Sequence, residues 1–481
     1  MKKKSLLFDR TFWRIMVPLA LPIALQNLLM TSFRLVDTLM VGRLGDVSIA
    51  AVGLAGYASF FVELVSFGMA SGSAVFLAQY HGAGNLKGIR RTMGAMLMFV
   101  VPIGLLFTVL TMVFPDVVMR LFTDDVLLIN EGVSYLRFAC LSYVALTINM
   151  ALGITLRCTE SVRIPMWTSG ICAVLNAILN YMFIFGFKAL GIPAMGVAGA
   201  GLATAISSLA NPLLVIIISV VKKNILIAPL SEMFALRGFL KQYWCCVLPV
   251  LMNEMLWSLS IVGINMVFGR MGTDNYAALT VERTIENIIF VFFVGICNAC
   301  NILVGKSIGA GLIEQGKRYA KQFMMLIPMF GIVLGVVVIL LRGPMVSLFD
   351  ISDAAARTAR IMLFIYAVDL SIRNIPYMEV VGIFRAGGDT KYGLLCDAAV
   401  QYIVVLPAVI FCGMVLKLPF LTTYIIMIVV DDVSKLCLTL PHFIRMKWIK
   451  PIRQENGFAN VLPLSVDPLE KAEETRQSYQ E

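Results

Sequence analysis

The chain has 481 residues, of which 59% are hydrophobic and 14% are charged, and its mean hydropathy is +0.87. Soluble domains average about 25% charged residues, so this composition excludes an ordinary soluble enzyme or binding protein. The net charge of +10 would suggest a nucleic-acid partner in a soluble chain, but here the distribution of Lys and Arg over membrane loops explains it better.

Apolar blocks follow one another along the whole chain, each long enough to cross a hydrocarbon core of about 30 Å. The first block follows a basic start, MKKKSLLFDR, and is too long for the core of a signal peptide, so we interpret it as an uncleaved span. The blocks predict an all-α polytopic membrane protein with twelve transmembrane helices. Their approximate bounds are 15–40, 47–78, 93–114, 133–156, 165–187, 195–221, 243–268, 276–303, 322–341, 358–384, 393–415 and 419–441.

Lys and Arg are divided unevenly between the two sets of alternating loops. One set, which includes both termini, holds twenty-four of these residues, and the other set holds nine. By the positive-inside rule, the side richer in Lys and Arg faces the cytoplasm. We therefore expect both termini in the cytoplasm and the protein in the plasma or inner membrane of the cell.

Two halves of the chain repeat at a nearly constant offset. LPIALQNLLM at Leu21 matches LPVLMNEMLW at Leu248, an offset of 227 residues. Later, LRCTESVR at Leu156 corresponds to FRAGGDTK at Phe384, with one residue added. Each half holds six helices, so the halves are parallel repeats. Such repeats enclose a central cavity between them and work by alternating access.

The repeat predicts two lobes, 1–226 and 243–453, joined by a cytoplasmic linker at 227–242. Residues 454–481 are polar and rich in Glu, which predicts a disordered tail. No insertion is large enough to be an ATPase, and VGKSIGAG at Val304 lacks the first glycine of a phosphate-binding loop. We therefore expect an ion gradient to drive transport, without a cofactor.

Several motifs resemble those of the multidrug and toxic compound extrusion (MATE) family across about residues 12–450. They are LPIALQNLLMTSFRLVDTLMVGRLG, AQYHGAG, VGKSIGAG, LNAILNYMFIFG with MGVAGAGLATAIS, and RAGGDTK. The resemblance implies a secondary antiporter, not an enzyme, that exports organic and often cationic compounds in exchange for H⁺ or Na⁺. We expect it to function as a monomer in the bilayer.

Asp37 in the first span occupies the family's first-helix aspartate position, which implies a role in ion coupling. An ionised carboxylate inside a membrane is costly, and in a cavity it can bind a proton or coordinate Na⁺. Arg34 lies one turn away on the same helix face. Two interpretations stay open. Arg34 and Asp37 either take part in ion coupling or only neutralise each other's charge.

The predicted fifth helix presents Asn176 and Asn180 on one face, four residues apart. The resemblance implies that these amides lie opposite Asp37 and that Thr204 adds a hydroxyl from the sixth helix. Such oxygens can form a proton-linked network, or a sodium site at Asp37, Asn176 and Asn180. Interhelical hydrogen bonding is the alternative role for them.

Five further side chains are candidates for binding a cationic substrate, either as carboxylates inside spans or as aromatic rings. They are Glu63, Glu254, Glu286, Tyr143 and Trp257. The sodium-coupled branch of the family has acids at the positions of Trp257 and Asn374, so the sequence favours H⁺. The alternative function is a flippase for a lipid-linked or polar precursor on a related two-lobed scaffold, which predicts more spans and a cavity lined by cations.

Overall fold

The computed structural model describes residues 10–187, 191–227, 229–349 and 351–452, and the tail expected at 454–481 lies outside them. Nearly all of the described chain is helical. The first half contains α1 (Arg10–Gly42), α2 (Asp46–Gly82), α3 (Leu86–Val113), α4 (Pro115–Arg120), α5 (Val126–Ala139), α6 (Ser142–Cys158), α7 (Arg163–Phe185) and α8 (Val197–Val221). After α9 (Leu230–Met233), the second half contains α10 (Phe239–Gly269), α11 (Thr273–Gly309), α12 (Ile313–Val346), α13 (Asp353–Tyr377), the π-helical turn η3 (Met378–Phe384), α14 (Arg385–Gly387), α15 (Thr390–Ala399), η4 (Val400–Val405), α16 (Leu406–Ile410), η5 (Phe411–Val415) and α17 (Phe420–Ile444).

The described helices combine into the twelve spans that the sequence predicts. Nine of them are long and apolar enough to cross a membrane, and the bent pair of α5 and α6 makes a tenth. The other two, α13 and α17, are each 25 residues long but carry more charged side chains. The fold class predicted from the sequence is therefore confirmed.

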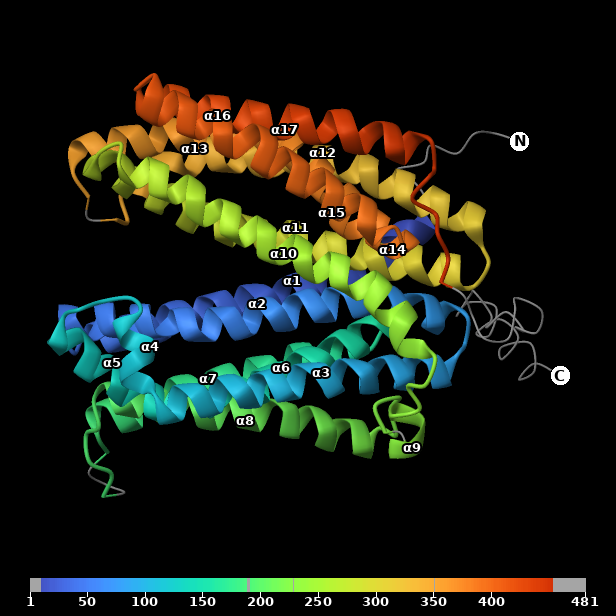
Figure 1. The fold of residues 1–481 in the computed structure, drawn as a ribbon, viewed down its shortest axis with the longest axis horizontal. Coiled ribbons are helices and arrows are strands. Elements are labelled where there is room, and N and C mark those ends of the chain that lie inside the picture. Colours follow the sequence, from blue (N-terminus) through green and yellow to red (C-terminus); the bar gives the residue numbers. More distant parts are fainter. Residues whose placement is uncertain (1–9, 188–190, 228, 350, 453–481) are drawn as a thin grey trace.

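The spans form two bundles (Figure 1). In the first lobe, from α1 to α8, α7 packs against α8 and α3 against α6. In the second lobe, from α10 to α17, α12 packs against α13 and α10 against α15. Across the boundary, α2 contacts α10 and α11. The ribbons of α2 and α10 converge toward the end that holds the start of α1 and the end of α17, which we call the terminal end (Figure 1).

Glycines allow α2 and α11 to approach closely at the terminal end. A Cβ atom on Gly82 would overlap the backbone carbonyl of Lys306, and a Cβ atom on Gly309 would overlap that of Gln79. The repeat of 227 residues relates Gly82 to Gly309 and Gln79 to Lys306. The two contacts are therefore copies of each other, as expected for parallel repeats about an axis along the membrane normal.

Aromatic side chains fill the boundary between the lobes near the same end. The rings of Phe76 and Phe239 lie edge to face with centroids 5.5 Å apart, and those of Phe12 and Phe323 with centroids 5.1 Å apart. All four rings are buried. Each such pair contributes about 0.5–1.5 kcal/mol beyond its buried area. The lobes are thus packed together at the terminal end.

The span predicted at 133–156 is not one straight helix. It begins earlier, at Val126, and bends by 51° between α5 and α6. At the bend, the hydroxyl of Thr108 on α3 donates to the carbonyl of Cys140 at 2.9 Å. A side chain from another helix that occupies a carbonyl of the helical ladder is a known cause of such kinks.

The span predicted at 358–384 also begins earlier, at Asp353, and it ends in η3. The side chains of Ser352 and Asp125 cap these two spans by accepting a hydrogen bond from a backbone N–H of the first turn. The caps lie outside the apolar windows, which explains the late starts predicted from hydropathy.

Candidate ion-coupling and substrate site

A cavity of about 530 Å³ lies inside the first lobe, away from the terminal end. Its walls come from the second half of α1, the first half of α2 and facing parts of α5, α6, α7 and α8. Apolar side chains alternate with hydroxyl and amide groups, and three charged residues reach the wall: Arg34, Asp37 and Glu63. A mostly apolar surface with a few placed polar groups is typical of a small-molecule site.

Asp37 stands at one end of a chain of hydrogen bonds that crosses three helices. Asn180 Nδ2 donates to Asp37 Oδ1 at 2.5 Å and to Asn176 Oδ1 at 3.1 Å. Asn176 Nδ2 in turn donates to Ser207 Oγ at 3.1 Å. The sequence prediction did not include Ser207, although it lies one turn after Thr204, which also lines the cavity. We call these four linked side chains, without Thr204, the Asp37 chain.

Asn180 is the fully buried member of the Asp37 chain. Its carbonyl oxygen Oδ1 has no hydrogen-bond partner among the described residues. A buried acceptor without a donor costs about 1–3 kcal/mol. A protonated Asp37 would supply such a donor after rotation of the Asn180 amide, because a carboxylic acid donates through its O–H. The pair can therefore accommodate both charge states of the carboxyl group.

The structure corrects the interpretation in which Arg34 and Asp37 neutralise each other. Arg34 Nη2 lies 2.6 Å from Glu63 Oε1 on α2. The Arg34 side chain is 67% exposed and that of Glu63 is 25% exposed. Ion pairs this open to solvent contribute about 1 kcal/mol or less. The partner of Asp37 is the amide of Asn180.

The aromatic candidates do not all reach the cavity. Tyr143 is fully buried in the core of the first lobe, so it cannot stack on a substrate in this structure. Trp257 is 44% exposed on α10 but lies outside the cavity wall. Tyr57 lines the cavity and stacks on Phe122 with ring centroids 5.4 Å apart. Tyr57 is therefore the better aromatic candidate.

Arginines hold the acids predicted in the second lobe. Glu254 Oε1 accepts a hydrogen bond from Arg385 Nη2 at 2.8 Å, and Arg385 Nη1 also donates to Ser71 of the first lobe at 2.6 Å. Glu286 Oε1 lies 2.6 Å from Arg373 Nη2. Both carboxylates are 13% exposed. Neither is free to bind a substrate cation here, and Arg385 instead joins the two lobes.

Other acids of the second lobe, Glu282, Asp369 and Asp432, are buried. Within the described ranges, no group of three or more His, Cys, Asp and Glu side chains is placed to hold a metal ion. Around Asp37, the oxygens of Asn176, Asn180 and Ser207 belong to amide and hydroxyl groups, which are hard ligands of the kind that hard cations take.

A second cavity, of about 70 Å³, lies between the lobes and is lined by polar side chains of both. On its first-lobe side, Arg157 Nη2 donates to Gln26 Oε1 at 2.9 Å, and Gln26 Nε2 donates to Ser169 Oγ at 2.9 Å. The sequence prediction did not bring these three side chains together, because they lie far apart in the chain. The central cavity is therefore small in this structure, and most of the accessible volume near Asp37 belongs to the first lobe.

Comparisons with known proteins agree with this architecture. The MatE family model matches residues 22–182 and 249–420, more than half of the chain. The chain is similar to a probable multidrug resistance protein NorM of Thermotoga maritima, at 25% identity over 451 residues, which cover 90% of this chain and 93% of that protein. It is also similar to multidrug and toxin extrusion protein 1 of Oryctolagus cuniculus, at 24% identity over 457 residues, which cover 93% and 78%.

Solved structures share the fold. A MATE crystal structure in the bent conformation superposes with a TM-score of 0.81 at 19% identity, over 91% of this chain and 96% of that one. An outward-facing multidrug resistance MATE family transporter of the MOP superfamily gives 0.81 at 19%, over 93% and 99%. With the family match over both halves, the twelve spans and the cavity in the first lobe, the chain belongs to the MATE family of multidrug efflux transporters, membrane proteins that extrude small organic compounds and are not enzymes.

Proposed function

We propose that the protein is a secondary antiporter that exports organic cations in exchange for H⁺, with Asp37 as the coupling carboxyl group. The observation that carries this proposal is the Asp37 chain on the wall of a cavity of about 530 Å³. Na⁺ is the alternative coupling ion at the same site.

The arrangement around Asn180 supports proton coupling. With Asp37 ionised, Asn180 Nδ2 donates to it and to Asn176 Oδ1. Asn180 Oδ1 has no hydrogen-bond donor among the described residues. When Asp37 is protonated, its O–H can donate to this oxygen. Rotation of that amide breaks the hydrogen bond to Asn176. Protonation therefore changes the contact that joins α1 to α7 and frees the Asn176 carbonyl oxygen next to the contact with α8, a local event that biases a conformational equilibrium.

The proposed orientation rests on the distribution of Lys and Arg, and the proposed state rests on the contacts between the lobes. We assign the terminal end to the cytoplasm by the positive-inside rule and the protein to the plasma or inner membrane. The lobes are joined at that end by the Arg385–Ser71 hydrogen bond and by the ion pair of Lys306 with Glu160 at 2.7 Å. The Asp37 cavity lies toward the other end, which corresponds to an outward-facing state. One chain supplies every residue of the site, so a monomer suffices.

Charge and exposure on the cavity wall favour a cationic substrate. On the cavity wall, the carboxylate of Glu63 pairs with Arg34, and the Arg34 side chain is largely open to solvent. A substrate cation can replace Arg34 there at a cost of about 1 kcal/mol or less. The ring of Tyr57, also on the wall, then offers a face for a cation–π contact.

The test is efflux of a fluorescent organic cation from proteoliposomes that contain the parent protein or Asp37→Asn. A pH gradient alone and a Na⁺ gradient alone drive transport in separate assays. We expect the pH gradient to drive efflux by the parent and not by Asp37→Asn, and the Na⁺ gradient to drive neither.

Glu63→Gln is the matched control, because it removes a carboxylate of the same cavity and leaves the Asp37–Asn180 contact in place. It should weaken substrate affinity and keep the response to the pH gradient. Transport by Asp37→Asn equal to that of the parent would move coupling to the buried acids of the second lobe. If the Na⁺ gradient drives transport by the parent and not by Asp37→Asn, the coupling ion at this site is Na⁺ and not H⁺.

A further inference from the structure

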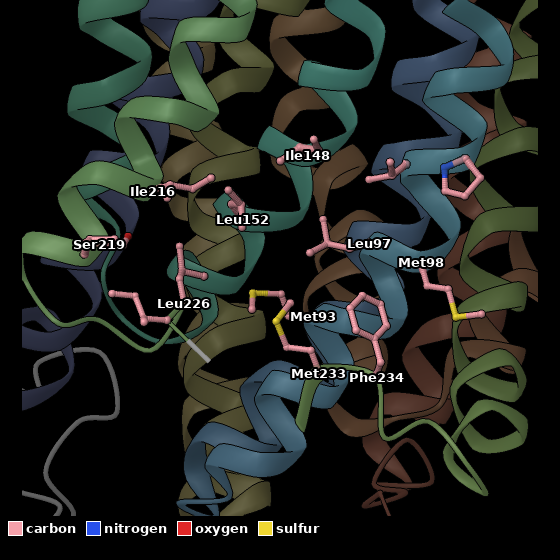
Figure 2. A pocket seen from close by; sticks show the side chains of 14 residues that line it. Met93, Leu97, Met98, Ile148, Leu152, Ile216, Ser219, Leu226, Met233 and Phe234 are labelled. Carbon is pink, nitrogen blue, oxygen red and sulfur yellow. The ribbon is translucent and has the colours of Figure 1, made fainter. Parts of the chain in front are cut away.

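An apolar groove of about 650 Å³ lies between α3, α6, α8 and the linker that joins the lobes (Figure 2). Of the fourteen side chains that line it, Ser219 is the only polar one. The linker closes one side, and the side chains of Met93, Met233 and Phe234 gather there (Figure 2). Thioethers and a ring make a surface that adapts to a flexible apolar ligand.

Beside the groove lies a second hollow, of about 410 Å³, which is basic. Met98 and Phe234 line both hollows, so the two are adjacent. The second is also lined by Arg237 and Lys241, which are exposed. An apolar groove therefore ends against two cations, all within one stretch of linker and the helices beside it.

These two cations have no counter-charge in the described part of the chain. Arg237 and Lys241 form no ion pair or hydrogen bond there. Glu232, the carboxylate of α9, is already bound to Arg90, with Arg90 Nη1 2.6 Å from Glu232 Oε2. Among the described residues, therefore, no carboxylate neutralises Arg237 and Lys241 in the basic hollow.

We propose that this composite groove binds an anionic glycerophospholipid, with an acyl chain in the apolar part and the phosphate against Arg237 and Lys241. An arginine fork matches the oxygens of a phosphate. Basic side chains beside an apolar surface at the headgroup level attract anionic lipids. The groove lies at the terminal end, which our proposed orientation places in the inner leaflet. A lipid held there ties the linker to the first lobe.

Native mass spectrometry of the full chain, released from detergent with added phosphatidylglycerol or phosphatidylcholine, tests this site. The parent should retain one phosphatidylglycerol in preference to phosphatidylcholine. Arg237→Gln with Lys241→Gln should lower the affinity for phosphatidylglycerol about tenfold to thirtyfold, the effect of two basic groups near an anionic headgroup. Ile216→Trp, which fills the apolar part, should lower retention of the lipid without changing any charge.

The control is Lys321→Gln with Lys391→Gln, two exposed cations at the same end of the second lobe. It should leave retention unchanged. An equal loss in the control would overturn the proposal in favour of diffuse attraction to the surface. Equal binding of glycerol phosphate and phosphatidylglycerol would overturn it too, because the acyl chain would then contribute nothing. None of these outcomes depends on ion coupling at Asp37.

Discussion

The two lobes share one scaffold but use their charges differently. At equivalent positions, Arg157 of the first lobe donates to the neutral amide of Gln26, whereas Arg385 of the second donates to the carboxylate of Glu254. The first lobe leaves its own carboxylate, Asp37, with an amide partner on a cavity wall. In the second lobe, the predicted acids are neutralised by arginines.

This difference shows which part of a duplicated transporter is free to change. Packing at the boundary is reciprocal, as the matched contacts of Gly82 and Gly309 show. Chemistry inside each lobe is not reciprocal, since a polar site needs its groups in only one copy. Both lobes therefore contribute equivalent contacts to the packed boundary at the terminal end, whereas we propose ion coupling for the first lobe alone.

The largest effect should come from the equivalent arginines. Arg385→Gln leaves the carboxylate of Glu254, which is only 13% exposed, without a counter-charge, and loss of a partner in such a largely buried pair costs about 3 kcal/mol. Arg157→Gln removes a hydrogen bond from a charged guanidinium to a neutral amide, which costs about 1.5–3 kcal/mol. Thermal unfolding in detergent should therefore show a larger fall in Tm for Arg385→Gln. Adding Glu254→Gln to that variant should restore most of the loss, and equal falls for the two single variants would contradict the comparison.

Next come the reciprocal glycines. Gly82→Ala and Gly309→Ala each place a Cβ against a backbone carbonyl of the other lobe, and overpacking of this kind costs about 1–3 kcal/mol. Both variants should open the terminal end, to a similar extent, as measured by the spin-label distance between positions 87 and 391. Gly53→Ala is the control, because open space surrounds its Cβ. Opening in only one variant would break the proposed symmetry of the boundary.

A smaller effect is expected within the Asp37 chain. Asn180→Ala removes the donor to Asp37 and should reduce transport driven by a pH gradient about tenfold, the scale of one hydrogen bond to a charged group. Asn176→Ala keeps that donor and should reduce transport less. Initial rates in proteoliposomes separate the two variants. The reverse order would show that the contact with Ser207 matters more than the contact with Asp37.

The smallest effect concerns Glu160, in the connection between α6 and α7. Burial raises the pKa of Glu160, but His81 at 3.9 Å and Lys306 at 2.7 Å outweigh it and lower the pKa from 4.5 to about 2. The contact therefore stabilises the protein above pH 4.5 and is lost as the pH falls from 4.5 toward 2. Over that range the Tm of the parent should fall slightly more than that of Glu160→Gln. Identical slopes would show that the pair does not stabilise the contact between the lobes.

The spans and the repeat could be predicted because the bilayer fixes the length of an apolar segment and the duplication fixes its register. Helix starts could not, because the caps at Asp125 and Ser352 lie outside the apolar windows. The bend before α6 could not either. It depends on Thr108, which reaches Cys140 from another helix.

The arrangement of the candidate site was predictable where its geometry is local. Asn176 and Asn180 share a helix face by spacing alone, and the family position pointed to Asp37. To predict that Arg34 pairs with Glu63, one must know how α1 is rotated relative to α2, and residue spacing does not give that rotation. The burial of Tyr143 was hidden for a similar reason, because core, cavity and lipid-facing positions are all apolar in a membrane protein.

The extra residue of the second half has a physical location. The caps Asp125 and Ser352 are 227 positions apart, but Arg157 and Arg385 are 228 apart. The insertion falls between them, in the stretch where the second lobe has the π-helical turn η3 and α6 of the first lobe is α-helical. A π turn takes one more residue than an α turn. A membrane helix can thus absorb an insertion near its end and still place Arg385 at the boundary between the lobes, so a change of length need not disturb the later helices.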